Sequence, residues 1–157
     1  MMRSVLGGVI VLAFACASPA QNRPARIDVE HYVITAEIDP ATSKLSAVVQ
    51  VRFNPVEDGV SSAEFELNNA LSVAKVTDAA GEQLQAARSQ EGAAIRVNLA
   101  NPLPKGQAAT LTFHFDGTLG GSEESPVPGI KFASIQKEAS FLLYPARWFP
   151  LNGYTTD

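Results

Sequence analysis

The sequence predicts an all-β fold, either an antiparallel β-sandwich or a saddle-like pair of curved sheets. From residue 28 onward, apolar residues recur at every second position, which is the period of a strand with one buried face. No stretch of about ten residues between 28 and 116 shows the 3.6-residue period of a helix. Clusters of Gly, Pro, Asn and Asp separate the alternating segments and delimit about seven short strands, as in all-β domains.

The first two alternating segments are predicted to form a hairpin. They are residues 32–38 and 45–53, and the Asp-Pro-Ala-Thr-Ser segment at 39–43 between them consists of turn formers. The predicted buried face of this hairpin is Tyr32, Ile34, Ala36, Ile38, Leu45, Ala47, Val49, Val51 and Phe53.

Further strands are predicted along the middle of the chain. They are centred on residues 62–67, 71–76, 84, 95–99 and 111–115. The sequence from Asp78 to Gly81 predicts a reversal before the strand at Leu84. The run from Asn101 to Gly106, with its prolines, predicts a break in the chain.

The character of the chain changes after Phe115. Residues 116–129 are rich in Gly, Ser, Pro and Glu, so they predict a surface loop. Residues 130–134 are compatible with one more strand, and residues 141–150 are the densest aromatic and apolar stretch. Because this stretch contains Pro145 and Pro150, it cannot be a regular helix or a central strand, and we predict an irregular edge or a covered turn.

The N-terminus has the pattern of an export signal. Arg3 precedes an apolar run that extends from Val5 to Ala17, and small residues follow at Ser18-Pro19-Ala20. We therefore predict a signal peptide at residues 1–20 and export to the periplasm or the extracellular space. Lipid anchoring through Cys16 is the less favoured alternative, because Phe14 fits the lipoprotein pattern poorly. The apolar run is too short for a permanent transmembrane span.

Composition excludes several classes of function. A net charge of −4 provides no basic field for a phosphate backbone, so no nucleic-acid partner is expected. The chain has two His and one Cys, too few of these ligands for an ordinary zinc site, and no metal is expected in it. The adjacent Glu123 and Glu124 are interpreted as solvated loop residues, and His31 and His114 as surface residues of strands. No catalytic residue is predicted.

The order of these features resembles the N-terminal domain of the zinc aminopeptidases related to aminopeptidase N. In that family a strand ends in Asp-Pro, as here at Asp39-Pro40, and a later strand closes with Leu-Asn before a short apolar run, as here at 67–68 and 71–73. The strand at 111–115 is followed by the Gly117 that the family also has, and Phe149-Pro150 resembles its Phe-Pro element, with Arg147 in the place of an Arg. The resemblance covers about residues 28–155.

The resemblance implies that residues 21–157 are a non-catalytic β-domain with its last strands incomplete. The family's Gly-x-Met-Glu-Asn and His-Glu-x-x-His signatures are absent, so zinc is expected in a missing catalytic domain and no activity is expected from this chain alone. Residues 142–145 stand in place of the loop that holds the substrate's amine. By position, the resemblance implies that Tyr144 and Arg147 line the substrate channel. Packing against the catalytic domain predicts an exposed apolar patch at Phe141, Leu143, Trp148 and Phe149.

Two functions from different classes follow. In the first, the chain is the scaffolding β-domain of an exported zinc aminopeptidase, partnered by the catalytic domain of the same protein and by a peptide substrate. In the second, it is a free-standing secreted β-sandwich that binds its partner through the loop at 116–129. A third reading is a complete protein that descends from the peptidases and retains only an interaction surface.

Overall fold

The structure is a computed structural model that describes residues 25–89, 92–119 and 127–152. Within these residues the secondary structure consists of strands and one short 3-10 turn, and every strand pairing is antiparallel. The predicted all-β antiparallel fold is therefore confirmed. The predicted signal peptide at 1–20, with Cys16, lies outside the described residues, as do Glu123 and Glu124.

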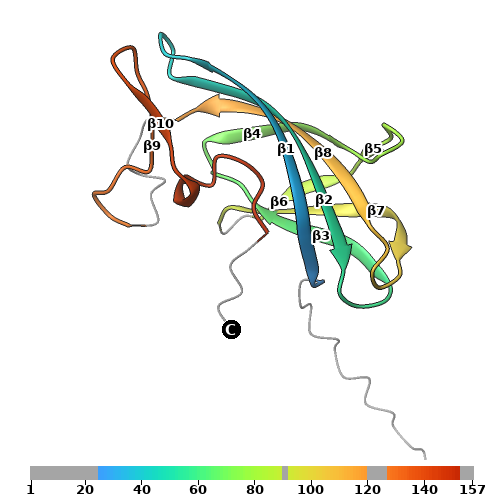
Figure 1. The fold of residues 1–157 in the computed structure, drawn as a ribbon. Coiled ribbons are helices and arrows are strands. Elements are labelled where there is room, and N and C mark those ends of the chain that lie inside the picture. The colour runs from blue at the N-terminus through green and yellow to red at the C-terminus, as the bar shows by residue number, and fades with distance from the viewer. Residues whose placement is uncertain (1–24, 90–91, 120–126, 153–157) are drawn as a thin grey trace, which may run out of the picture.

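A five-stranded sheet forms one layer of the fold (Figure 1). In spatial order its strands are β1 (Ile27–Asp39), β2 (Lys44–Pro55), β8 (Ala109–Thr118), β4 (Leu71–Thr77) and β5 (Gln83–Leu84). β1 and β2 form the predicted hairpin, with Asp39 opposite Lys44 at the turn. The long strand β1 is one edge of this sheet and β5 is the other.

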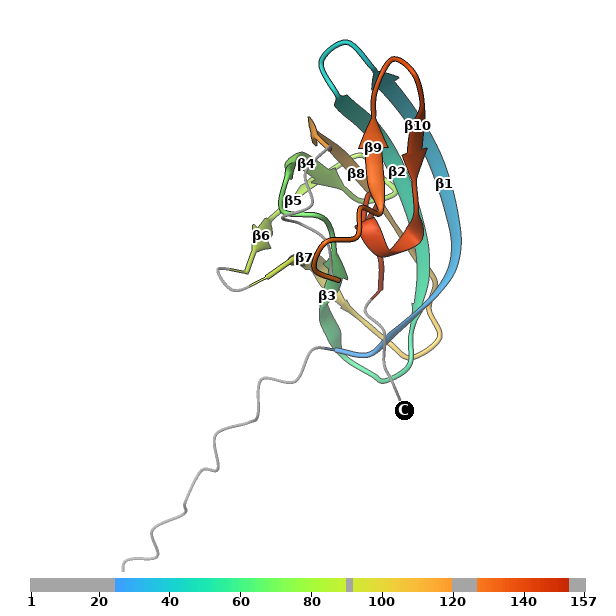
Figure 2. The same cartoon turned by 90° about the vertical axis from the view of Figure 1, so that its left-hand side faces the viewer.

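A three-stranded sheet forms the second layer. Its spatial order is β3 (Val60–Glu66), β7 (Ala94–Leu103) and β6 (Ala86–Arg88). The chain passes from the first sheet to the second at Gln85, between β5 and β6, so a single predicted strand around Leu84 is divided between the two layers. Figure 2 shows the two layers from the side.

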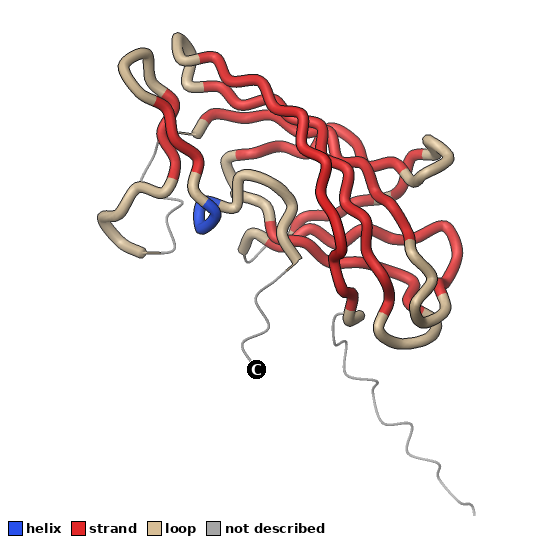
Figure 3. Tube along the Cα trace, viewed as in Figure 1, coloured by secondary structure: helices blue, strands red, loops and turns tan. Residues whose placement is uncertain are grey.

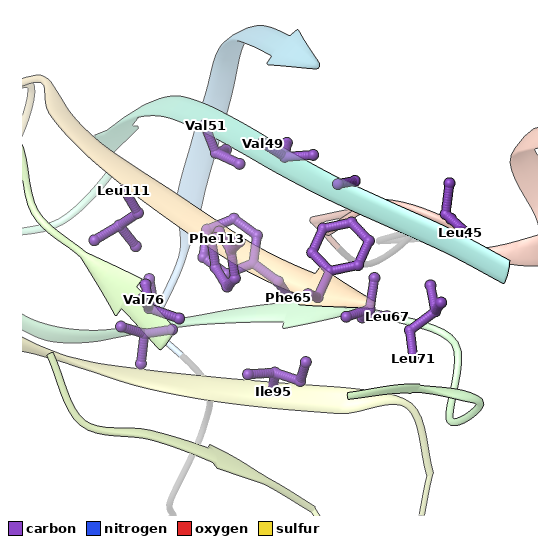
Figure 4. Close-up of a cluster of buried hydrophobic side chains, with 14 of the residues drawn as sticks. Leu45, Val49, Val51, Phe65, Leu67, Leu71, Val76, Ile95, Leu111 and Phe113 are labelled. Carbon is purple, nitrogen blue, oxygen red and sulfur yellow. The ribbon is translucent and has the colours of Figure 1, made fainter. Parts of the chain in front are cut away.

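The core lies between these two sheets. Figure 4 shows the side chains of β2 and β8 meeting those of β3 and β7. Phe65 of the second sheet makes edge-to-face contacts with Phe53 and Phe113 of the first, at centroid distances of 6.2 and 5.2 Å. These three rings are almost completely buried, and aromatic pairs of this geometry stabilise a core beyond the area that they bury.

The predicted buried face of the first hairpin is correct for β2 but wrong at the far end of β1. Leu45 is completely buried, whereas Ala36 is exposed and Ile38, which is opposite Leu45 in the register, is 45% exposed. The reason is position in the sheet. β2 is covered on its inner face, while β1 is an edge strand whose last residues lie outside the core cluster.

Three strand limits differ from the predictions. β7 continues through Pro102 to Leu103, beyond the predicted break at Asn101, because Leu103 pairs with Val60 of β3. β8 continues to Thr118, so the first residues of the predicted loop at 116–129 are strand, paired with β2 and β4. The strand predicted at 130–134 is β9 (Ala133–Ile135).

Gly117 is required where it stands because another segment crosses it closely. A Cβ atom at this position would lie 2.0 Å from the carbonyl oxygen of Ala70, in the connection between β3 and β4. Such a distance is far inside van der Waals contact, so any side chain at 117 displaces this connection. The glycine thus permits the close approach of residues 67–71 to β8.

The last described elements form a separate hairpin and turn. They are β9, β10 (Ser140–Leu142) and the 3-10 turn η1 (Tyr144–Ala146), which Figure 3 shows in blue. We refer to residues 127–152 as the C-terminal unit. Its hairpin lies beside the turn between β1 and β2, where the Ser43 hydroxyl donates a hydrogen bond of 2.8 Å to the carbonyl of Ile135. Within the described residues no helix has the length and apolar character needed to cross a membrane.

Candidate functional site at the C-terminal turn

The residues predicted to line the substrate channel or to pack against another domain all lie in the C-terminal unit. The predicted irregular segment is confirmed, since residues 141–150 contain the end of β10, η1 and a non-repetitive stretch. Pro145 stands in the first turn of η1, where its fixed φ suits the turn and its missing N–H is not needed. The turn ends at Arg147, whose backbone is left-handed at φ 49° and ψ 43°.

The end of β3 holds this segment in place. Glu66 and Leu151 exchange two backbone hydrogen bonds, of 2.6 and 2.9 Å. Two residues further on, the Asn68 backbone N–H donates to the carbonyl of Arg147 at 2.8 Å, and the Asn68 side-chain amide donates to the carbonyl of Ala146 at 2.9 Å. Asn68 is buried, so these bonds form away from water, where backbone carbonyls need partners.

Arg147 has a carboxylate partner in its own chain. Its Nε donates to Oε2 of Glu66 at 2.6 Å, and the two side chains are 33% and 31% exposed. This ion pair joins the C-terminal turn to the end of β3.

An aromatic cluster lies on the inner side of the turn. Phe149 is its centre and makes edge-to-face contacts with Tyr32, Tyr144 and Trp148, at centroid distances of 5.3, 6.0 and 4.8 Å. Tyr32, Trp148 and Phe149 are half-buried and pack against the core. Burial raises the pKa of the Tyr32 phenol above its ordinary value, and a hydrogen bond from the backbone of Asn152 partly opposes this effect.

The residues predicted to pack against another domain divide into two groups. Phe141 and Leu143 are 41% and 49% exposed, and Tyr144 is 45% exposed. Val127 and Ile130 of the same unit are exposed as well, so most of the exposed large apolar side chains in the described residues belong to the C-terminal unit. Trp148 and Phe149 are instead half-buried against the chain's own core. The unit therefore presents an apolar surface while its deeper aromatic residues attach it to the sandwich.

Sequence reasoning did not identify Glu66, Asn68 and Tyr32 as partners of the turn. Glu66 lies in a predicted strand and Asn68 directly follows it, and neither position indicates a distant partner. Their partners are 81 and 78 residues away along the chain, a separation at which local pattern contains no information about pairing.

The described residues offer no metal site. No three His, Cys, Asp or Glu side chains within them lie close enough together to hold an ion. His31 is on β1 and His114 is on β8, with β2 between them. The described residues therefore bring no zinc ligand set together.

The alternative binding loop at 116–129 is only partly described. Asp116 lies in β8 and forms an ion pair of 2.7 Å with Lys44 across the strand pair. Residues 120–126, the centre of the predicted loop, lie outside the described residues.

Comparison with solved structures shows which proteins share this fold. A crystal structure of an M1 zinc metallopeptidase from Deinococcus radiodurans matches with a TM-score of 0.67 and 21% identity, over 85% of this chain and 30% of the metallopeptidase. A mutant of a D. radiodurans enzyme, bound to a Tyr-Ser-Ala substrate, matches with a TM-score of 0.65 and 20% identity over 83% of this chain. Yeast LTA4 hydrolase in complex with bestatin matches with a TM-score of 0.54 and 16% identity, over 89% of this chain and 23% of the hydrolase.

The matching region is a fraction of each of these enzymes, because the chain spans about 30% of the length of the metallopeptidases. This is consistent with the N-terminal domain of an M1 aminopeptidase, the fold that the sequence resemblance implied. No family profile matches the sequence, and no curated protein matches it.

Proposed function

We propose that this chain is the N-terminal β-domain of an exported zinc aminopeptidase, a scaffold that partly lines the substrate entrance of a catalytic domain outside this chain. The observation that carries the proposal is the shared fold, since metallopeptidases that act through zinc contain this β-domain as about 30% of their length. In this proposal zinc and the catalytic residues belong to the catalytic domain. This chain packs against that domain and forms part of the wall of the substrate entrance.

The distribution of apolar surface supports a partner domain. The exposed side chains Phe141, Leu143, Val127 and Ile130 belong to one unit of the chain, and exposed large apolar side chains concentrated in one part of a domain support a surface that another domain covers. The covering domain that we propose is the catalytic domain of the same protein. Trp148 and Phe149, which are half-buried, pack against the chain's own core.

Tyr144 and Arg147 have different parts in this proposal. The ring of Tyr144 is 45% exposed, and we assign it the contact with the substrate. The guanidinium of Arg147 is paired with Glu66, so its role is to hold the turn. A peptide is the substrate class that we propose, because a metallopeptidase of this fold was crystallised with Tyr-Ser-Ala.

The proposal is tested on the longer protein encoded by the reading frame beyond Asp157. We expect that frame to encode His-Glu-x-x-His and the protein to hydrolyse amino-acyl anilides. Replacing Tyr144 by Ala should lower kcat/KM about tenfold, since loss of a contact made in the transition state costs about 1.4 kcal/mol per factor of ten. The control is Val33→Ala, an exposed residue of β1 whose removal should leave kcat/KM unchanged. A frame without the zinc signature would contradict the proposal, and so would a Tyr144 variant with unchanged kcat/KM.

The isolated chain gives a second test. Purified residues 21–157 should bind no stoichiometric zinc and release no amine from amino-acyl anilides, because the described residues bring no set of metal ligands together. Metal analysis after dialysis and a chromogenic assay measure these two properties. Hydrolysis by this chain that a chelator abolishes would contradict the proposed division of roles.

A further inference from the structure

Two residues of the described chain other than glycine have a positive φ, and both hold the C-terminal unit. They are Ser43, with φ 55°, and Arg147, with φ 49°. Ser43 binds the carbonyl of Ile135 at the end of β9. Arg147 ends the turn η1 at the opposite end of the unit. The unusual backbone conformations thus occur where the unit is attached.

The conformation of Arg147 is costly and must be maintained by its surroundings. A left-handed backbone is unfavourable for an L-residue with a Cβ, and it persists where neighbouring contacts over-determine it. Three contacts do so here. The Arg147 N–H donates to the carbonyl of Tyr144 at 3.1 Å, its carbonyl accepts from Asn68 at 2.8 Å, and its Nε donates to Glu66 at 2.6 Å.

Burial alone does not account for ordering this turn. Leu143 and Tyr144, which the contacts hold, are 49% and 45% exposed, so they gain only part of the free energy that burial gives to an apolar side chain. Ordering them costs backbone and rotamer entropy. A strained and well-anchored backbone that presents exposed side chains is the arrangement expected of a pre-organised contact surface.

We propose that Glu66 is a positioning residue that acts through Arg147 to fix Tyr144 in one place on the surface. The ion pair holds Arg147 in its left-handed conformation, this conformation closes η1, and η1 sets the direction of the Tyr144 ring. Asn68, two residues after Glu66, completes the arrangement by donating to the carbonyls of Ala146 and Arg147. The substrate-facing role of Tyr144 rests on the proposed function, but the positioning itself does not.

The test is amide hydrogen exchange of the 157-residue chain, measured by NMR, for Glu66→Gln and its matched control Glu64→Gln. Glu64 is on the same strand and, at an even spacing of two, on the same face, and it is partly exposed like Glu66. In the Glu66 variant the amides of Ala146 and Arg147 should exchange about tenfold faster, because the charge-assisted bond that holds the Arg147 side chain is weakened. In the control their exchange should stay within about twofold of the wild-type rate.

The exchange rates of amides in the core strands show whether the Glu66 variant loosens only the turn or destabilises the whole fold. Val49 and Phe113, in β2 and β8, should keep their wild-type exchange rates in the Glu66 variant. Arg147→Met removes the pair from the other side and tests it if the Glu66 variant fails to fold, whereas Arg147→Lys keeps the positive charge and should retain most of the wild-type protection at residue 146. The proposal is overturned if residues 146 and 147 keep wild-type protection without the pair, or if core amides accelerate equally.

This experiment separates the inference from the proposed function. The exchange rates are measured on this chain and require no catalytic domain. If Tyr144 contributes nothing to catalysis in the longer protein, faster local exchange in the Glu66 variant still establishes the positioning role.

Discussion

At the scale of single residues, the connection between β3 and β4 shows how one side chain can organise several others. The guanidinium of Arg88 donates to the carbonyls of Leu67 and Leu71 at 2.8 and 2.7 Å, and also to the carbonyl of Asn68 at 3.3 Å. This connection carries Asn68, which in turn binds the C-terminal turn. The planar guanidinium has several N–H donors in fixed positions, so a single arginine can bind several carbonyls at once.

Replacing Arg88 by Met should therefore be strongly destabilising. We expect the free energy of unfolding to fall by about 2–3 kcal/mol, because partly buried carbonyls lose a charged donor. Urea denaturation followed by circular dichroism measures this change. Arg52→Met is the control, since Arg52 forms an exposed ion pair with Glu30 that should contribute about 1 kcal/mol or less. Equal losses in the two variants would show that Arg88 does not organise the connection.

Titration of the Tyr32 phenol should make the free energy of unfolding depend on pH in the alkaline range. Burial raises the pKa of its phenol in the folded state above the ordinary value of 10.0. The folded chain therefore favours the neutral phenol, so this contribution to stability is complete below pH 10.0 and is lost as pH rises from there through the folded pKa.

Tyr32→Phe should remove this part of the alkaline loss while retaining the ring in contact with Phe149. Urea denaturation at a series of pH values from about 9 to 11 should show a shallower decline for this variant than for the wild type. The control is Val33→Ala, an exposed residue of the same strand with no titratable group, which should decline as the wild type does. Identical slopes for the wild type and Tyr32→Phe would contradict the assigned cause.

At the scale of elements, the hairpin of β1 and β2 shows what alternation predicts and what it does not. Alternation correctly divides β2 into a buried and an exposed face, because residues at even spacing point to the same side of any strand. It cannot tell whether another layer covers that side. β1 alternates equally well, yet its last residues are exposed because β1 is an edge.

Ile38 and Leu45 are opposite each other in this hairpin and provide a matched pair for mutation. Leu45→Ala should lower the free energy of unfolding by about 2–5 kcal/mol, because it creates a cavity at a completely buried site. Ile38→Ala should cost about 1 kcal/mol or less, because that side chain is 45% exposed. Chemical denaturation of both variants measures the difference, and equal costs would mean that the end of β1 is covered in solution.

Turn chemistry is the element-scale feature that the sequence predicts best. The reversal at Asp78 to Gly81 joins β4 and β5 as expected, with Gly81 at a φ of 86°. The carboxylate of Asp78 accepts hydrogen bonds of 2.9 Å from the backbone of Ala80 and Glu82. These contacts span four residues or fewer, so the residue types that make them are visible in a short window of sequence.

At the scale of the whole molecule, the C-terminal unit is attached to the sandwich at its inner side and is apolar at its outer side. The attachment uses Ser43, Glu66 and Asn68, which belong to different parts of the chain. The outward side chains include Phe141 and Leu143. A domain that presents a rigid surface to a neighbour requires this arrangement, with one side anchored and the other side apolar and exposed.

The double variant Phe141→Ser and Leu143→Ser should lower binding of a hydrophobic dye to the isolated chain, with little change in the free energy of unfolding, because both residues are largely in contact with solvent. Dye fluorescence titrated against protein concentration measures the first effect, and denaturation measures the second. The control replaces Val33 and Val48, exposed valines of β1 and β2, by Ser and should reduce dye binding less. A reduction of the same size in the control would show that the C-terminal unit is not the main apolar surface.

Sequence alone determined the strand segments, the first hairpin and its turn, the reversal at Asp78 to Gly81 and the irregular path of residues 141–150. All of these follow from steric and hydrogen-bonding preferences within a few residues. Tertiary structure decided which faces are covered, that Gly117 must admit the carbonyl of Ala70, and that Arg147 meets Glu66. These features depend on which distant segments come together, and that choice is made by the packing of the whole core, where many strands of similar pattern compete to pair.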